Sequence, residues 1–217
     1  MAAIFGPAAN LAAKVTLVLL ALLVIAGCAA WWLWPQTDYS THVRTVLEQP
    51  VAFSHQHHVA GLGVDCRFCH TSVEVSASAG LPPTYTCMTC HSQIWTNAAL
   101  LAPVRASLAN HKPLVWHRVT DLPDYVYFNH SIHIAKGVGC QSCHGAIESM
   151  ALTYKAKPLT MDFCLDCHRD PGPNLRPRSA LLDTQWRRTP NTPTPAQLMA
   201  LYHVPDRNLT DCSLCHR

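Results

Sequence analysis

Charged residues are scarce in this chain of 217 residues, at 13% of the total against roughly 25% in an average soluble domain. Amphipathic helix periodicity is also weak after residue 40. The sequence contains no catalytic triad, no glycine-rich phosphate loop and no paired carboxylates; Asp121 and Asp124 flank Pro123, an arrangement typical of a turn. Together with 16 prolines, these absences argue against an ordinary soluble helix-and-sheet enzyme.

The chain instead repeats one pentad, Cys-x-x-Cys-His, five times. Two thiols three positions apart can each form a thioether to one porphyrin edge, and the histidine that follows can bind the iron from one face. We therefore predict five covalently bound haem c groups. The cysteines that attach them and the histidines that bind iron are Cys66, Cys69 and His70; Cys87, Cys90 and His91; Cys140, Cys143 and His144; Cys164, Cys167 and His168; and Cys212, Cys215 and His216.

Two other uses of paired cysteines compete with haem attachment. Ten cysteines of an exported chain can form five disulfides, and two Cys-x-x-Cys pairs can bind one zinc ion. Neither use needs a histidine directly after the second cysteine. With 14 histidines in the chain, five at that position by chance have a probability on the order of one in a million, so haem attachment is favoured.

Five haems in fewer than 180 residues predict that the porphyrins form most of the hydrophobic core. The expected fold class is a loop-rich multihaem cytochrome c, with short helices and few short strands wrapped around the haems. The formal charge of +3 becomes roughly −2 with ferric haems and roughly −7 with ferrous haems once two propionates per haem are included. The basic residues are therefore interpreted as neutralising propionates, and nucleic-acid binding is not supported.

An uncharged stretch runs from Val15 to Trp34 and predicts one transmembrane helix, with tryptophans at its far end as an aromatic belt. Lys14 favours a cytoplasmic amino terminus, and haem attachment takes place outside the cytoplasm, so the haem domain is expected in the periplasm. A cleaved signal is the competing interpretation, because residues 25–28 resemble a lipoprotein processing box ending at Cys28. The apolar run continues six residues beyond Cys28, which favours an uncleaved anchor.

The pentads belong to a duplicated pattern. Phe53-Ser54-His55-Gln56-His57-His58 precedes the pentad at Cys66 as Phe128-Asn129-His130-Ser131-Ile132-His133 precedes that at Cys140, and a second pentad follows each. The expected organisation is a cytoplasmic segment (1–14), a transmembrane anchor (15–34), a connector (35–50), two two-haem modules (51–110 and 111–170) and a Pro/Arg-rich tail with the fifth haem (171–217).

The repeated Phe-x-His-x-x-His motif supplies candidates for the distal iron ligands. Histidines at positions i and i+3 of a helical turn leave the same side about 60° apart, so they can reach two adjacent irons. We predict His55, His58, His130 and His133 as distal ligands. The sequence leaves the fifth open, mainly between Met161, whose thioether would raise the haem potential, and His117. Other histidines outside the pentads are His42, His57, His111 and His203.

Three further segments carry weaker structural expectations. Residues 97–109 are expected to form a short helix, and residues 121–128 alternate enough for a short strand that leads into the second histidine pair. Residues 171–205 are rich in proline and arginine, with little apolar periodicity. Such a tail is expected to lie against a partner or the haems rather than to form a core.

Two family resemblances follow from these motifs. The Phe-x-His-x-x-His motif before Cys-x-x-Cys-His resembles the class III cytochromes, c3 and c7. The strings FSHQHH, CRFCHTSVE, LPDYVYFNHSIH, GVGCQSCHG, MDFCLDCHRDP and CSLCHR resemble the membrane-anchored pentahaem subunit of alternative complex III, a bacterial inner-membrane complex. This resemblance covers residues 49–217.

The resemblance implies an electron carrier without substrate chemistry of its own. It would relay electrons from a quinol-oxidising complex to a periplasmic cytochrome c or a terminal oxidase. The implied partners are membrane lipid, a polytopic quinol-binding subunit, an iron–sulfur protein and a monohaem cytochrome c. A free-standing anchored quinol dehydrogenase that feeds periplasmic reductases is the alternative. A catalytic multihaem reductase ranks third, because it needs an iron with an open sixth position.

Overall fold

The first structural unit is dominated by one long helix. A computed structural model describes residues 6–216, so residues 1–5 and Arg217 of the predicted terminal segments lie outside the described residues. Helix α1 (Pro7–Leu33) has 27 residues and begins with proline in its first turn, where the missing N–H has no helical partner. At about 1.5 Å per residue, it exceeds the roughly 30 Å of a hydrocarbon core.

The apolar side chains of α1 are exposed along its length, as Leu17 and Leu23 illustrate at 66% and 69% exposure. The stretch 8–36 is long and apolar enough to cross a membrane, and it contains the predicted anchor. The helix is therefore compatible with a single-pass membrane anchor. After a 3-10 turn (Trp34–Gln36), the short helix α2 (Asp38–Thr41) is capped by Thr37, whose hydroxyl accepts a hydrogen bond from the Ser40 N–H.

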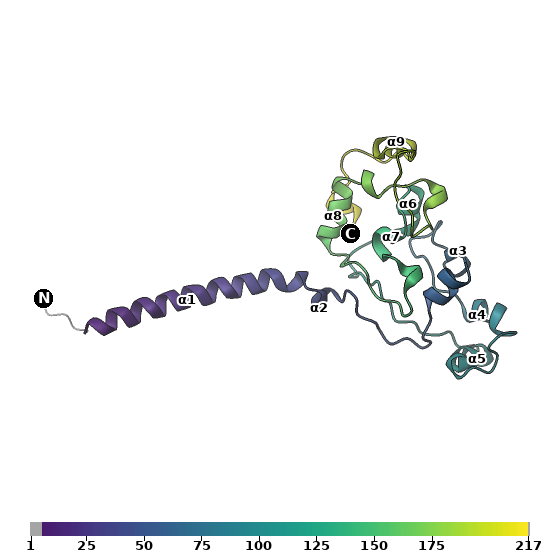
Figure 1. Ribbon diagram of the computed structural model, residues 1–217, viewed down its shortest axis with the longest axis horizontal. Coiled ribbons are helices and arrows are strands. Elements are labelled where there is room, and N and C mark those ends of the chain that lie inside the picture. The colour runs from purple at the N-terminus through teal and green to yellow at the C-terminus, as the bar shows by residue number, and fades with distance from the viewer. Residues whose placement is uncertain (1–5, 217) are drawn as a thin grey trace. The chain divides into compact units, whose positions relative to one another are not determined.

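The second unit begins at Val43 and consists of short helices joined by irregular segments (Figure 1). In residues 43–216, β-structure is confined to four isolated bridges. The helices are a π-helical turn (Gln56–Gly61), α3 (Cys66–Cys69), α4 (Thr84–His91), α5 (Ala102–Ala109), α6 (His130–Ala135), α7 (Gln141–His144), α8 (Met161–Arg169) and α9 (Pro195–Leu201), with 3-10 turns at Ala99–Leu101, Ile147–Ser149, Gly172–Asn174, Arg178–Ala180 and Cys212–Leu214.

Two of the local expectations need correction. The strand expected at 121–128 is wrong: the N–H of Val126 donates to the carbonyl of Pro123, which closes a turn, and only a single bridge joins Val126 to His216. The helix expected at 97–109 begins later, as a 3-10 turn that continues into α5. Its Pro103 lies in the first turn of α5 because a proline inside a helix costs a hydrogen bond.

The side chains of the second unit also form two small hydrophobic clusters. One contains Val51, Leu101 and Val104. The other contains Leu175, Leu198 and Tyr202, so the expectation that the tail forms no core is wrong. The i, i+4 spacing of Leu198 and Tyr202 places both on one side of α9, whose start is fixed by a capping box between Thr194 and Gln197.

Gly137 follows α6 and lies against Tyr202 of the second hydrophobic cluster. Its φ is +85°, and a methyl group there would collide with the ring of Tyr202. We expect Gly137→Ala to lower the free energy of unfolding by about 2–5 kcal/mol, from the left-handed backbone and from overpacking. Thermal unfolding of the holo-protein measures the effect.

Gly63 is the matched control for this prediction. Its φ is +69°, and open space surrounds the position of the added methyl group. Gly63→Ala should therefore cost only the backbone term of about 1–2 kcal/mol. Equal losses in both variants would show that the contact with Tyr202 contributes nothing.

Candidate functional site

Each pair of pentad cysteines lies on a helical turn. Helices α3, α4, α7 and α8 carry the first four pentads, and the 3-10 turn Cys212–Leu214 begins the fifth. Positions i and i+3 of a helical turn share one face, so both thiols of a pair are directed to the same side. No disulfide joins any of the eleven cysteines in the described part of the chain. Among residues 6–216, no group of three or more His, Cys, Asp or Glu side chains is arranged to hold a metal ion.

Seven of the eight thiols of the first four pentads are partly buried, and Cys90 is exposed. Burial is the main cause of raised thiol pKa values, and the pKa of Cys143 reaches about 11. Such thiols are protonated at neutral pH and serve poorly as thiolate ligands. A thioether carries no ionisable proton, so these sites fit covalent attachment to an apolar ring. The other cysteines whose pKa is raised mainly by burial are Cys66, Cys69, Cys87, Cys140, Cys164 and Cys167.

The two Phe-x-His-x-x-His motifs adopt nearly the same geometry. The ring of Phe53 meets His55 edge-on at 5.0 Å and stacks on His58 at 4.5 Å. Phe128 does the same to the two histidines that follow it, at 4.8 and 4.5 Å. The phenylalanine thus holds two imidazoles at nearly perpendicular orientations, which directs them toward two different partners.

Three of these four histidines face a pentad histidine. The ring centres are 6.2 Å apart for His58 and His91, 6.3 Å for His130 and His144, and 6.1 Å for His133 and His168. Two metal–nitrogen bonds of about 2 Å each, plus the distance from each nitrogen to its ring centre, require roughly 6 Å. The three pairs therefore fit one iron between two imidazoles.

The fourth motif histidine, His55, lies near the remaining pentad histidine of its module. Its pKa is lowered to about 4, first by burial and then by the neighbouring His70. Burial and the neighbouring His130 likewise lower the pKa of His144 to about 4. Both imidazoles are therefore neutral at physiological pH, which is the form that binds a metal.

Hydrogen bonds at Nδ1 determine which nitrogen of these histidines is free. A backbone carbonyl can only accept, so a ring that bonds one through Nδ1 carries its proton there and leaves Nε2 available to a metal. His55 instead bonds the hydroxyl of Thr153. The carbonyl-bonded pairs, at 2.7–3.2 Å, are His58 with Ser54, His70 with Gly80, His91 with Ile94, His130 with Ala77, His133 with Asn129, His168 with Leu209 and His216 with Tyr125.

The carbonyl acceptors and Thr153 were missed by reasoning from the sequence. A carbonyl group is present in every residue, so no residue type marks it. The fifth distal ligand also stays open. His117 bonds the Glu48 carbonyl through Nδ1 at 2.7 Å, in the same way as the carbonyl-bonded histidines above. Met161 is 64% exposed at the start of α8, and the ring that packs on His216 is that of Tyr125, at 5.8 Å.

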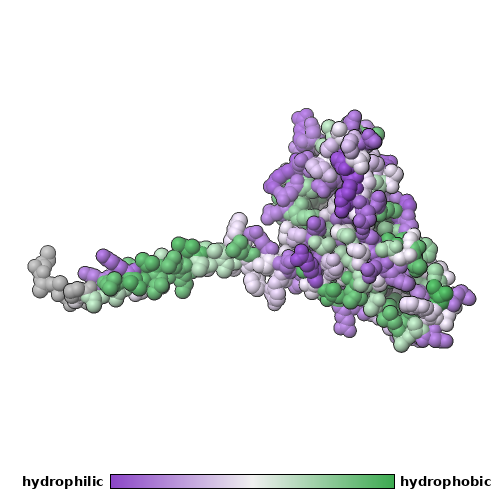
Figure 2. Space-filling model, in the orientation of Figure 1, coloured by the Kyte–Doolittle hydropathy of each residue, from purple (hydrophilic) through white to green (hydrophobic). Residues whose placement is uncertain are grey.

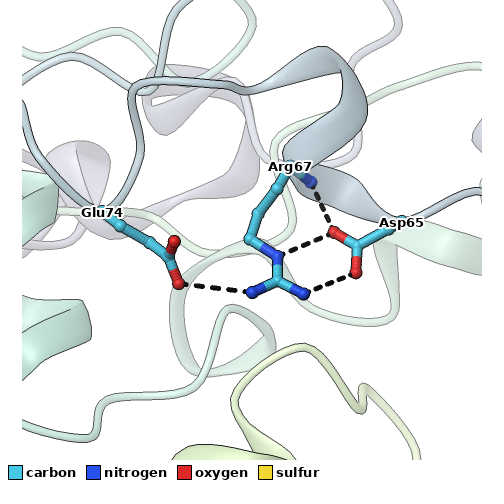
Figure 3. Close-up of polar contacts among 3 residues, drawn as sticks. All are labelled: Asp65, Arg67 and Glu74. Atoms are coloured by element: carbon cyan, nitrogen blue, oxygen red, sulfur yellow. Dashed lines mark hydrogen bonds and ion pairs between the residues drawn. The ribbon is translucent and has the colours of Figure 1, made fainter.

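An ionic cluster fixes the start of the first pentad (Figure 3). The carboxylate of Asp65 caps α3 by accepting from the N–H of Arg67, and it also binds the Arg67 guanidinium at 2.8 and 3.0 Å. Glu74 lies 3.6 Å from the same guanidinium. These hydrogen bonds with Arg67 lower the pKa of Asp65, so the cap keeps its charge well into the acidic range.

Basic residues line a groove of about 580 Å³ beside the third pentad, which contributes Gln141 and Ser142 to its wall. Arg176 is almost fully buried there, with its guanidinium over Trp186 at 4.9 Å. It donates to the carbonyl of Asp183 at 2.9 Å. Burial lowers its pKa, but a guanidinium still stays charged at neutral pH. The other basic residues of the groove are Lys157, Arg187 and Arg188.

Comparison with known proteins gives two matches. A family model described as "Cytochrome c7 and related cytochrome c" matches residues 126–217. The chain is also 36% identical over 149 residues to a protein of Nitratidesulfovibrio vulgaris named "Menaquinone reductase, multiheme cytochrome c subunit". That alignment covers 68% of this chain and 62% of the relative. Residues 126–217 thus resemble cytochrome c7 and related cytochromes c, and the helix-rich chain is similar over 149 residues to that multihaem subunit, of whose length it spans 62%.

Proposed function

We propose that the chain is the electron-transfer subunit of a quinone-linked oxidoreductase complex and relays electrons through five c-type haems. The observation that carries the proposal is the set of three facing histidine pairs, with ring centres 6.1–6.3 Å apart. Two imidazoles on one iron fill both axial positions, which suits electron transfer rather than substrate binding. The subunit therefore needs no substrate chemistry of its own.

In this proposal the ten pentad cysteines form the thioethers and the five pentad histidines are the proximal ligands. His55, His58, His130 and His133 are the distal ligands of the first four haems, and Met161 or His117 serves the fifth. Residues 51–110 and 111–170 are the two modules, and the segment 171–217 carries the last haem. The anchor at 15–34 holds the subunit in the bacterial cytoplasmic membrane, with the haems in the periplasm and residues 1–14 in the cytoplasm.

The proposed partners are a polytopic quinone-binding subunit, an iron–sulfur protein and a monohaem cytochrome c. Two directions of electron flow have support. The motifs that resemble those of alternative complex III favour quinol oxidation, with electrons leaving to a cytochrome c or a terminal oxidase. The relative in Nitratidesulfovibrio vulgaris belongs to a menaquinone reductase, which favours the opposite direction.

The test uses the full chain, purified from membranes with its partner subunits. We expect five haems per polypeptide by protein mass and iron content, and rapid haem reduction by quinol or by a reduced periplasmic cytochrome. The donor that works defines the direction. A complex that keeps its quinone-linked activity after the haems of this chain are removed would contradict the proposal. Haem reduction by quinol in the chain expressed alone would favour the free-standing quinol dehydrogenase instead.

A further inference from the structure

The two Phe-x-His-x-x-His segments, called here the first (residues 53–58) and second (residues 128–133) histidine turns, each connect two haem attachment sites. The five attachment sites are numbered one to five in sequence order. In the first turn, His58 faces His91 of site two, and His55, three residues earlier, packs on the same Phe53 ring and is the proposed distal ligand of site one. Sites one and two are therefore neighbours.

The second histidine turn connects sites three and four. His130 faces His144 of site three, and His133 faces His168 of site four. Both histidines of this turn pack on the ring of Phe128. Sites three and four are therefore neighbours as well.

Residues 76–80 connect the two modules. The carbonyl of Gly80 accepts from Nδ1 of His70 at 2.8 Å, which anchors the proximal ring of site one. Three residues earlier, the carbonyl of Ala77 accepts from both Nδ1 and the backbone N–H of His130, at 2.8 and 3.1 Å. One short segment thus holds a ring of site one and a ring of site three, which places these two sites together.

Sites four and five are connected through the tail. Nδ1 of His168 donates to the carbonyl of Leu209 at 2.7 Å, three residues before the fifth pentad begins at Cys212. Site five therefore adjoins site four.

Exposure of the cysteines marks the two ends of this series. Cys90 of site two and Cys212 of site five are exposed, whereas both cysteines of sites one, three and four are partly buried. In Figure 1 the helices of sites two, one, three and four (α4, α3, α7 and α8) follow one another across the second unit. We propose that the five attachment sites lie in the spatial order two, one, three, four, five, and that electrons enter and leave the subunit at sites two and five.

This inference rests on the proposed function, because it describes the path within the same relay. The proposed spatial order differs from the order of the pentads along the chain, in which site two would lie between site one and site three. The two orders make opposite statements about site three: its neighbour in the first module is site one in the proposed order and site two in the sequence order.

Site three can be recognised by electron paramagnetic resonance. Its two imidazole planes differ by 8°, whereas those of site two differ by 71°. Parallel imidazoles split the iron d orbitals strongly and give a rhombic low-spin signal, whereas near-perpendicular ones give a highly anisotropic signal. Site four, with planes that differ by 32°, is also expected to be rhombic, so the signal of site three is taken as the rhombic component that disappears in Cys140→Ala/Cys143→Ala. The midpoint potential of this rhombic signal reports site three.

The experiment compares two full-length holo-proteins that each lack one haem of the first module. Cys66→Ala/Cys69→Ala removes site one and Cys87→Ala/Cys90→Ala removes site two. We expect the first change to shift the midpoint potential of the rhombic signal and the second to leave it unchanged. A shift caused by removal of site two but not site one, equal shifts in both proteins, or no shift in either would overturn the proposed order.

A second pair of variants keeps all five haems. His55→Met exchanges the distal ligand of site one, and His58→Met exchanges that of site two. Each exchange raises the midpoint potential of the haem at that site, so this haem is reduced earlier in the titration. Only His55→Met should shift the rhombic signal, and a shift with His58→Met alone would overturn the order. An unmodified chain without any attached haem would contradict the proposed function itself, so the two failures are distinguishable.

Discussion

Replacement of Cys140 and Cys143 by alanine is expected to leave a chain with four haems and to reduce electron transfer through the complex more than about 100-fold. That loss exceeds the 10–100-fold effect of changing an outer-shell partner of a metal site, because the whole third site is removed. In the proposed order this site joins the first module to the second. Its loss would separate sites one and two from sites four and five. Haem content and the steady-state rate from quinone-linked donor to acceptor measure the effect.

Ser142→Ala is the matched control for this double substitution. Ser142 lies between the two cysteines and forms part of the wall of the basic groove beside them. The control should keep five haems and a normal rate. A normal rate in the double variant, with four haems confirmed by mass, would contradict a continuous path through site three.

Sequence reasoning works best here where the chemistry is local. Cys-x-x-Cys-His and Phe-x-His-x-x-His each fit within one or two helical turns, so their spacing alone determines which side chains share a face. The helical turns at His55 and His130 have this geometry, and the phenylalanine of each motif orients both rings. The assignment of these side chains to five haems stays a prediction, although the ring distances support it.

Reasoning from the sequence fails where contacts join distant segments. Ala77 and Gly80 have no side-chain chemistry, yet their carbonyls anchor rings of two different sites. Similarly, Tyr125 is part of a segment that was expected to be a strand, but Pro123 closes a turn there and the Tyr125 carbonyl anchors His216. Hydrogen-bond acceptors on the backbone carry no sequence signal, so the order of the sites depends on the fold.

The tail contains a helix-start motif that its overall composition obscures. Thr194-Pro195-Ala196-Gln197 has the spacing of a capping box with proline in the first turn, which marks the start of a helix. Leu198 and Tyr202 then follow at i, i+4 spacing and are buried against Leu175. Prolines and arginines on both sides hid this short helix in a composition typical of an extended segment. The tail thus builds a core that supports the second module.

The second large effect is expected from His133→Ala, which should convert about one fifth of the haem iron from low spin to high spin. His133 faces His168 at 6.1 Å, and its Nδ1 bonds the Asn129 carbonyl at 2.7 Å, so its Nε2 is free to bind iron. Burial lowers the pKa of His133, which keeps the ring neutral. Alanine cannot reach the iron from this position, so the fourth site would bind an added ligand such as carbon monoxide or cyanide.

His203→Ala is the control, because this side chain is exposed and lies outside both repeated motifs. It should leave all the iron low spin. His133→Met separates ligation from packing: a thioether at the same position should restore the low-spin state and raise the potential of that haem on the order of 0.1 V within the roughly 0.8 V range that axial ligands span. If His133→Ala stayed fully low spin, another side chain would bind the fourth haem, and the duplicated motif would supply only three distal ligands.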